Sequence, residues 1–79
     1  MNEMLFDWPF KIQMYNRRWN LIFATVSYDW EECTIRFKWK NLTKVIEFVR
    51  EWYRDKQKNS DEYYPLKQYL KCNRDLFLW

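Results

Sequence analysis

The chain has 79 residues, of which 48% are apolar, 23% aromatic and 32% charged, and its formal net charge is +3. This composition is typical of a single small globular domain over residues 1–79 and excludes an intrinsically disordered chain. The absence of glycine excludes Gly-rich phosphate loops and nucleophile elbows, and the absence of histidine removes the commonest general base and zinc ligand.

The first predicted strand covers residues 10–15. Residues 1–9 form an apolar lead-in, and Pro9 favours an extended conformation where that lead-in ends. Apolar side chains then alternate with others, as in a strand that buries one face. The alternating sets are Phe10, Ile12 and Met14 on one face and Lys11, Gln13 and Tyr15 on the other. Residues 16–18 follow as a polar connection, in which Asn16 is best suited to a left-handed turn conformation.

The second predicted strand covers residues 19–28, and neither of its faces is polar. One set is Trp19, Leu21 and Phe23, and the other is Ile22, Ala24, Val26 and Tyr28. This pattern suits a central strand covered on both sides, or a strand that exposes an apolar and aromatic strip. The acidic turn at residues 29–32 lacks the spacing and the glycine of a calcium loop, so we expect no metal there.

The third predicted strand, residues 33–40, alternates between a core face and a basic face. The core face is predicted to hold Cys33, Ile35, Phe37 and Trp39, and the basic face Thr34, Arg36, Lys38 and Lys40. The other cysteine, Cys72, lies near a predicted helix end. Two cysteines so far apart in sequence are expected to be free thiols, with a disulfide between them as the alternative.

A long amphipathic helix is predicted directly after this strand, with Asn41 as the residue that caps its N-terminus. Spacings of three and four residues place the apolar side chains in one stripe. That stripe consists of Leu42, Val45, Ile46, Val49, Trp52 and Tyr53, and the solvated face of Lys44, Glu47, Arg50, Glu51, Arg54 and Asp55. A helix of about four turns is long enough to cover the strands.

The polar residues 55–62 are predicted to form a helix end and a loop. Pro65 is suited to the first position of a second, shorter helix. The apolar face of that helix consists of Leu66, Tyr69 and Leu70. Residues 76–79 are too apolar for a frayed tail, so we expect them to dock on the core, for example as a short edge strand, or to form an interface. The predicted fold class is therefore α+β: a three-stranded antiparallel meander, a long amphipathic helix and a short second helix.

The outward face of the predicted sheet is the first candidate binding surface. It interleaves positive charges with aromatic rings, and single-stranded nucleic acid requires both, because cations bind phosphates and flat rings stack on bases. The candidate residues are Lys11, Tyr15, Arg17, Arg18, Arg36, Lys38 and Lys40. The alternative is an ordinary solvated strand face, which lysines protect against aggregation.

The large aromatic residues fall into two groups. Those at regular spacing are predicted to belong to the core rather than to a ligand site, and they are Phe23, Phe37, Trp39 and Trp52. Trp8, Trp30 and Trp79 lie outside the regular patterns and are the better interface candidates.

The loop at residues 59–64 is the second candidate binding segment. Its residues Asp61, Glu62 and Tyr63 combine acids with an aromatic ring. Such a combination could imitate phosphate and base, and so contact the basic nucleic-acid-binding surface of another protein. An ordinary helix entry is the alternative.

In the order of its elements the chain resembles small anti-CRISPR proteins of phages. Three strands run into a helix, and an acidic loop with tyrosine and a second short helix follow. The segments that show this order are 21–23 (Leu-Ile-Phe), 34–36 (Thr-Ile-Arg), 45–53 and 61–63 (Asp-Glu-Tyr). Those proteins occupy the DNA-binding surface of a CRISPR nuclease. The strand order is also similar to DNA-binding modules of plant transcription factors and phage integrases, in which Arg36 and Lys38 would lie on the reading face.

We therefore expect a small binding protein that is not an enzyme and holds no cofactor and no metal. The first hypothesis is a phage or mobile-element inhibitor that binds a host nucleic-acid-handling protein, and the alternative is a domain that binds DNA or RNA directly through the sheet. A homodimer joined through the second strand or Trp79 is the third possibility. Residues 1–7 have acids where a signal peptide has lysines, and no apolar run could span a membrane, so a soluble, cytoplasmic protein with no membrane partner is expected.

Overall fold

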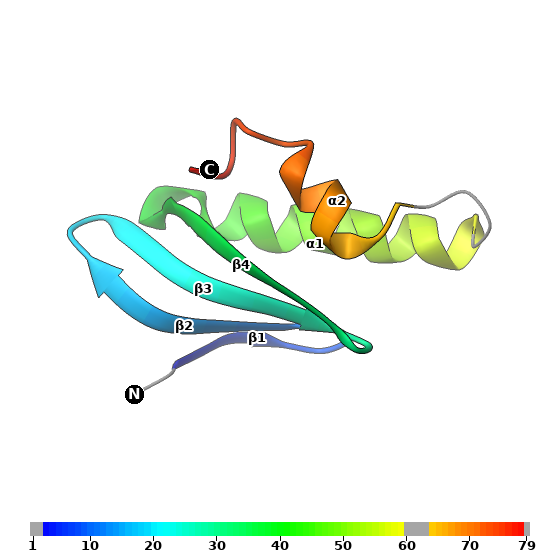
Figure 1. Cartoon of the computed structure of the whole chain (residues 1–79), viewed down its shortest axis with the longest axis horizontal. Helices are drawn as coiled ribbons and strands as arrows, with labels where there is room; N and C mark the ends of the chain where they lie inside the picture. The colour runs from blue at the N-terminus through cyan, green and yellow to red at the C-terminus, as the bar shows by residue number, and fades with distance from the viewer. Residues whose placement is uncertain (1–2, 60–63, 79) are drawn as a thin grey trace.

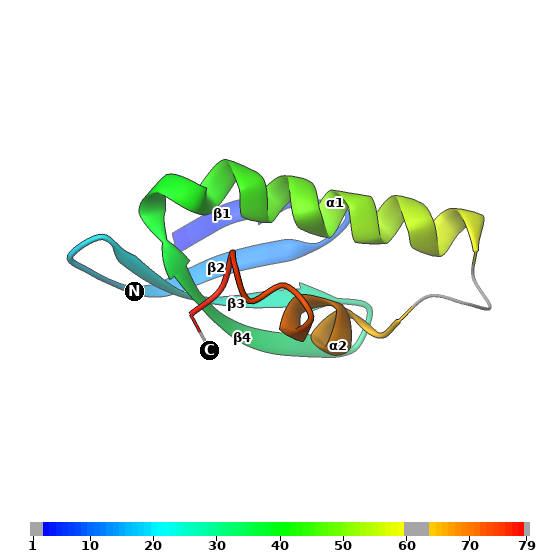
Figure 2. The same cartoon turned by 90° about the horizontal axis from the view of Figure 1, so that it is seen from above.

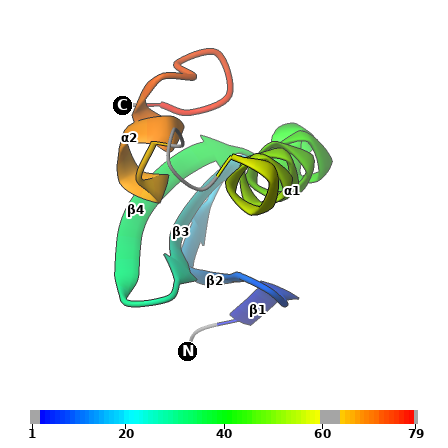
Figure 3. The ribbon, with the colours of Figure 1, turned by 90° about the vertical axis from the view of Figure 1, so that its right-hand side faces the viewer.

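The computed structural model describes residues 3–59 and 64–78, which form a four-stranded antiparallel sheet with two helices on one of its faces (Figure 1, Figure 3). The strands are β1 (Glu3–Asp7), β2 (Lys11–Arg18), β3 (Leu21–Tyr28) and β4 (Glu31–Lys38), in this order across the sheet. The remaining elements are a 3₁₀ helix, η1 (Trp39–Asn41), the long helix α1 (Leu42–Lys58) and the short helix α2 (Leu66–Lys71). The predicted α+β class, with an antiparallel sheet, a long helix and a short helix, is confirmed.

The prediction of three strands is wrong, because the N-terminal lead-in is itself a strand. β1 pairs antiparallel with β2, and Phe6 lies opposite Ile12. The register shifts between Met4 and Phe6, and this bulge hides the alternation that would identify so short a strand from sequence. The chain then reverses at residues 8–10, before β2 begins. In this turn the backbone N–H of Trp8 donates to the carbonyl oxygen of Phe10 over 2.8 Å.

The connection predicted at residues 16–18 is also wrong, since these residues are the end of β2 and the turn lies at residues 19–20. β2 has a bulge at Tyr15, where its register with β3 shifts. The extra residue interrupts the alternation of side chains, so a polar run that resembles a loop continues the strand. Trp19, rather than Asn16, takes the left-handed conformation, with a φ of 60°.

β4 confirms the core face that was predicted for it, apart from its last member. Cys33, Ile35 and Phe37 are buried. Trp39 was predicted to join them, but its side chain is 39% exposed. The backbone N–H of Trp39 donates to the carbonyl oxygen of Asn20 over 2.7 Å, and the chain then turns into η1, so the alternation of the strand ends before Trp39.

α1 begins where it was predicted to begin. Asn41 precedes its first residue, although the Asn41 side chain makes no capping hydrogen bond. In the apolar stripe Val45, Val49 and Trp52 are buried and the other three members are half-buried, while every residue predicted for the solvated face is exposed. The stripe of α1 therefore faces the sheet.

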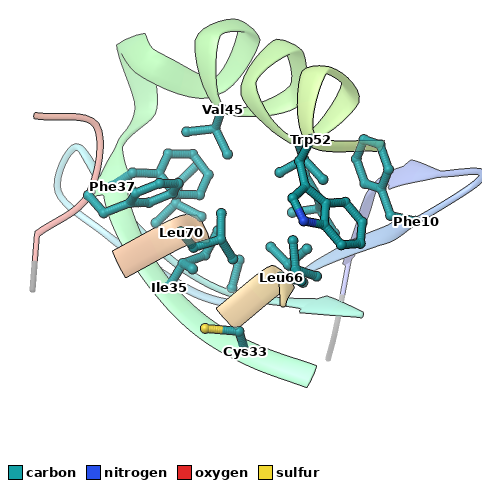
Figure 4. Packing of buried hydrophobic residues seen from close by; sticks show 14 residues of the cluster. Phe10, Cys33, Ile35, Phe37, Val45, Trp52, Leu66 and Leu70 are labelled. Carbon is teal, nitrogen blue, oxygen red and sulfur yellow. The ribbon is translucent and has the colours of Figure 1, made fainter. Parts of the chain in front are cut away.

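The core lies between the sheet and the two helices. Figure 4 shows Val45 and Trp52 projecting from α1 toward Leu66 and Leu70 of α2. The buried residues are Phe10, Ile12, Ile22, Ala24, Val26, Cys33, Ile35, Phe37, Val45, Val49, Trp52, Leu66, Leu70 and Phe77. Burial of a large apolar side chain contributes about 1.5–3 kcal/mol, so these residues are the main source of stability.

Two hydrogen bonds attach α2 to the rest of the fold. The indole N–H of Trp52 in α1 donates to the carbonyl oxygen of Tyr64 over 2.8 Å. A carboxylate oxygen of Glu31, at the start of β4, accepts the N–H of Leu66 over 2.9 Å. Residues 64–66, at the entry to α2, are thereby fixed to both α1 and the sheet.

The predicted docking of the C-terminal segment is confirmed for the residues that the structure describes. Phe77 is 2% exposed and packs in the core. The N–H of Leu78 donates to the carbonyl oxygen of Arg36 over 2.7 Å, which places this segment along the edge of β4. Trp79 lies outside the described residues.

Candidate nucleic-acid interface

The sheet has two ends of opposite charge. At one end the β2–β3 turn lies close to the end of β4 and the start of α1, and Figure 2 shows this hairpin projecting from the molecule. We call it the basic end, and its residues are Arg17, Arg18, Trp19, Lys38, Trp39 and Lys40. The β1–β2 and β3–β4 turns lie at the other end. We call it the acidic end, and its residues are Asp7, Trp8, Asp29, Trp30, Glu31 and Glu32.

The segments that form the basic end contain no acidic residue. Residues 16–21 include two Lys or Arg and residues 38–46 include three, a total of five, and neither segment contains Asp or Glu. α1 begins here, and its first turn is also free of acids. Because the N-terminus of a helix has a partial positive charge, α1 adds to the positive potential. The basic end is therefore suited to binding an anion.

Two tryptophan rings are exposed among these cations. The side chain of Trp19 is 86% exposed and that of Trp39 is 39% exposed. The guanidinium carbon of Arg17 lies 4.3 Å from the centroid of the Trp39 ring, a cation–π contact. Arg17 belongs to the helix-covered face of β2, since it pairs with the buried Ile22. The contact fixes a positive charge beside an aromatic ring that also faces solvent.

A surface pocket with a volume of about 470 Å³ lies against both tryptophans. Its lining consists of Trp19, Asn20, Leu21, Lys38, Trp39 and Lys40. Its volume is within the range of ordinary small-ligand sites, roughly 300–1,000 Å³. The pocket lining thus combines two tryptophans with two lysines and one asparagine.

The outer face of the sheet, opposite the helices, extends the basic end toward the centre of the molecule. The strand pairings place its side chains in rows. From the basic end to the acidic end, these rows are Arg18, Leu21 and Lys38; Asn16, Phe23 and Arg36; Gln13, Thr25 and Thr34; and Lys11, Ser27 and Glu32. The ring of Tyr15 lies 6.2 Å from the ring of Phe23, so the second row has two neighbouring aromatic rings beside Arg36. The net charge is positive in the first two rows and zero in the last two, where Lys11 is offset by Glu32, and among these rows aromatic rings occur only in the second.

The structure brings most of the predicted site residues together. Arg17, Arg18, Lys38 and Lys40 lie at the basic end, and Tyr15 and Arg36 lie in the adjoining row. Lys11 lies apart from them, opposite Asp7 and in the same row as Glu32. Its partner Ser27 is six residues along β3 from Leu21, a separation of roughly 20 Å. Asp61, Glu62 and Tyr63 lie outside the described residues.

Trp19 is the site residue that sequence reasoning missed, because it was assigned to a strand. All three connections between strands place a tryptophan at positive φ, and the angles are 134° for Trp8, 60° for Trp19 and 82° for Trp30. The same three side chains are 74%, 86% and 100% exposed, respectively. A left-handed conformation costs an ordinary residue roughly 1–2 kcal/mol, and exposed indoles recover none of this through packing. Such positions are typical of contact sites for a partner.

The aromatic side chains that were predicted to be core divide between the core and this surface. Phe37 and Trp52 are buried, as predicted. Phe23 is half-buried on the outer face, and Trp39 is exposed at the basic end. Trp8 and Trp30, predicted as interface candidates, are exposed at the acidic end.

The two thiols lie away from the basic end in the environments expected of them. Cys33 is buried and Cys72 is exposed after α2, and both are free. Burial raises the pKa of the Cys33 thiol, although the positive charges of Lys67 and Lys71 act in the opposite direction. Cys33 is therefore an unreactive core residue.

Within residues 3–59 and 64–78, no group of three or more His, Cys, Asp or Glu side chains is placed to hold a metal ion. Among the helices of this part of the chain, none has the length and apolar character needed to cross a membrane. Comparison with protein-family models, with curated proteins and with solved structures finds no match to this chain.

Proposed function

We propose that the protein binds single-stranded nucleic acid through the basic end and the adjoining row of the outer face. One observation supports this proposal above all others. Arg17, Arg18, Lys38 and Lys40 gather beside two exposed tryptophans, in segments that contain no acid. Lysine and arginine neutralise phosphates, and indole rings stack on bases whatever their sequence.

The exposed rings favour a single strand over a duplex. Trp19 lies at the tip of a hairpin, and Tyr15 and Phe23 lie next to each other on the outer face. A ring can stack only on a base whose flat face is accessible, and the bases of a duplex present their edges instead.

This proposal is tested by titrating labelled single-stranded and double-stranded DNA and RNA of one sequence with the protein, followed by fluorescence anisotropy at low and at physiological salt. We expect saturable binding that is tighter for the single strands. Four phosphate contacts predict that log K falls with log salt concentration with a slope of roughly −3, since each contact on a single strand contributes about 0.7. No saturable binding at low salt, where phosphate contacts are strongest, would exclude the proposed function.

The acidic end supports a second candidate function. Trp8 and Trp30 are exposed there beside Asp7, Asp29 and Glu32. Acids next to aromatic rings can imitate phosphate and base, so this end is suited to the basic nucleic-acid-binding surface of another protein. The prediction of a phage or mobile-element inhibitor is a special case of this function, and it stays a prediction.

The two candidate functions use different ends of the molecule, so variants separate them. Trp30→Ala combined with Glu32→Lys alters the acidic end, and Trp19→Ala combined with Lys38→Glu alters the basic end. A protein partner that the first variant fails to retain and the second variant retains would support the inhibitor or adaptor function. If the wild-type protein binds neither nucleic acid nor such a partner, both candidates fail.

A further inference from the structure

We infer that the pocket between the β2–β3 turn and the end of β4 is a site for one unstacked nucleotide, with the base against the indole rings and the phosphate on the lysines. This inference rests on the proposed function and names the unit of the ligand that the pocket receives. It also predicts that a free nucleoside monophosphate binds without the rest of a strand.

The walls of the pocket are suited to a flat aromatic group. Trp19, Leu21 and Trp39 supply apolar surface, and the pocket volume is about 470 Å³. One indole has a neighbour that restricts it, because the guanidinium carbon of Arg17 lies 4.3 Å from the centroid of the Trp39 ring. The backbone N–H of Trp39 donates to the carbonyl oxygen of Asn20 over 2.7 Å, which fixes the backbone that carries this ring. A ring that is already positioned loses little conformational freedom when a base stacks on it.

The polar groups of the pocket are suited to the other parts of a nucleotide. Lys38 and Lys40 supply two ammonium groups, which are donors for a phosphate. Asn20 also lines the pocket, and an asparagine side chain carries both a donor and an acceptor, which is the combination that a base edge requires. An apolar side chain of a protein partner would leave the two lysines without an anion, and an inorganic phosphate would leave the two indole rings without a stacking group.

The position of the pocket agrees with a place along a bound strand. Leu21 and Lys38 belong both to the pocket and to the first row of the outer face. The next row contains Phe23 with Tyr15 beside it, so a strand that leaves the pocket reaches a second stacking platform directly. The pocket therefore anchors one base, and the outer face receives the neighbouring ones.

The test uses three probes: adenosine monophosphate, adenosine and ribose 5-phosphate. Binding of each to the full-length protein is followed by NMR, through the indole N–H signals of the six tryptophans. We expect the monophosphate to shift the signals of Trp19 and Trp39 with saturation, and the other two probes to bind at least about 10-fold more weakly because each lacks one contact.

The chain offers a matched control for the decisive variant. Trp19→Ala should weaken binding of the monophosphate by about 5- to 150-fold, which is the range expected for loss of one base–aromatic stack. Trp30→Ala removes a tryptophan that is fully exposed and also at positive φ, at the acidic end, and should leave binding unchanged. The dispersion of the remaining amide signals shows whether each variant is folded.

The outcomes separate this inference from the proposed function. If oligonucleotides bind in a salt-dependent way but the monophosphate leaves the Trp19 and Trp39 signals unchanged, the function stands and the nucleotide pocket is overturned. Equal binding by the wild-type protein and Trp19→Ala would overturn it too. If an acidic, tyrosine-containing peptide shifts these signals and the monophosphate does not, the pocket is a protein-binding site. If no nucleic acid binds, both proposals fail.

Discussion

The basic end and the acidic end both expose tryptophans at a hairpin turn, and their charges are opposite. Each has a hairpin turn with an exposed tryptophan at positive φ, and the angles are 60° at Trp19 and 82° at Trp30. Each also has a second exposed tryptophan, Trp39 at the basic end and Trp8 at the acidic end. The acidic end has two further residues at positive φ, Trp8 at 134° and Asp29 at 53°, so the conformational cost of its turns is the larger. We expect charge to be the property that selects what each end binds.

The ends also differ in how their charged groups contribute to the fold. At the acidic end Glu31 accepts the N–H of Leu66 over 2.9 Å, so one carboxylate fixes the entry to α2. At the basic end, Arg17 contacts the rest of the fold through its cation–π contact with Trp39. Lys38 and Lys40 line a pocket instead. We therefore expect charge changes at the acidic end to affect stability and charge changes at the basic end to affect binding.

The largest effect is expected from Lys38→Glu combined with Lys40→Glu. Two charge-assisted phosphate contacts contribute about 3 kcal/mol together, so affinity for a single-stranded oligonucleotide should fall about 100-fold and the salt slope should become shallower. The matched change at the other end, Glu32→Lys, should not weaken binding. The affinities of both variants are compared by fluorescence anisotropy at one salt concentration. An equal loss of affinity in both would show that the two ends do not differ in binding the oligonucleotide.

A smaller effect, on stability alone, is expected from Glu31→Ala. The variant leaves the N–H of Leu66 without its carboxylate acceptor, which should lower the free energy of unfolding by about 1–2 kcal/mol. For a domain of this size the melting temperature should fall by about 4–8 °C per kcal/mol. Thermal unfolding is followed by circular dichroism, with Lys38→Ala as the control, and a control variant that melts as early as Glu31→Ala would contradict the comparison.

Relief of the turn conformation should have a still smaller effect, of the same sign at both ends. Asparagine tolerates positive φ better than tryptophan does, so Trp19→Asn and Trp30→Asn should each raise the free energy of unfolding by up to about 1 kcal/mol. Urea unfolding measures this gain. Only Trp19→Asn should also lose affinity for oligonucleotides. If Trp30→Asn gains stability but loses affinity for oligonucleotides, the binding surface includes the acidic end, which would contradict the proposal.

Arg17→Ala should have a modest effect that is confined to the basic end. An exposed cation–π pair contributes about 0.5–1 kcal/mol, so stability should fall by no more than this amount. The indole N–H signal of Trp39 should shift in an NMR spectrum, whereas that of Trp8 should not. An unchanged Trp39 signal would show that the two side chains are not stacked in solution.

The smallest expected effect is a pH dependence of the free energy of unfolding, which arises from residues in or against the core rather than at either end. Burial raises the pKa of the Cys33 thiol and also that of Tyr69, to which the charges of Asp55 and Glu51 add. A group with a raised pKa in the folded state stabilises the fold fully below its unfolded pKa, and this contribution is lost as the pH rises through the folded value. The free energy of unfolding should therefore decline above about pH 9. Cys33→Ala should lessen the decline, and a rise in stability over that range would contradict these assignments.

The elements with regular periodicity could be predicted from the sequence. The spacing of Val45, Val49 and Trp52 located α1, and the alternation of Cys33, Ile35 and Phe37 located β4. β1 and the end of β2 could not be predicted, because a bulge in each strand interrupts the alternation. The β2–β3 turn has tryptophan where glycine is usual, so its position was not predicted. The turn predicted at residues 29–32 does fall on the β3–β4 connection, although Glu31 and Glu32 already belong to β4.

The site could be predicted only in part. Arg36 and Lys38 of β4 were identified because their parity opposes that of core residues such as Phe37, whereas Arg17 and Arg18 were identified as part of a predicted polar connection. That Arg17 and Arg18 lie at the same end as Lys38 and Lys40 depends on strand register, which sequence does not specify. Trp39 leaves the core only because the chain turns into η1, a tertiary event.

The most direct test of the two-ended account is an NMR titration of the protein with a short single-stranded oligonucleotide. The six indole N–H signals are assigned from single Trp→Phe variants and followed at low salt. The account predicts that the signals of Trp19 and Trp39 shift with saturation while those of Trp8 and Trp30 stay in place. Shifts at Trp8 and Trp30 with none at Trp19 and Trp39 would contradict it.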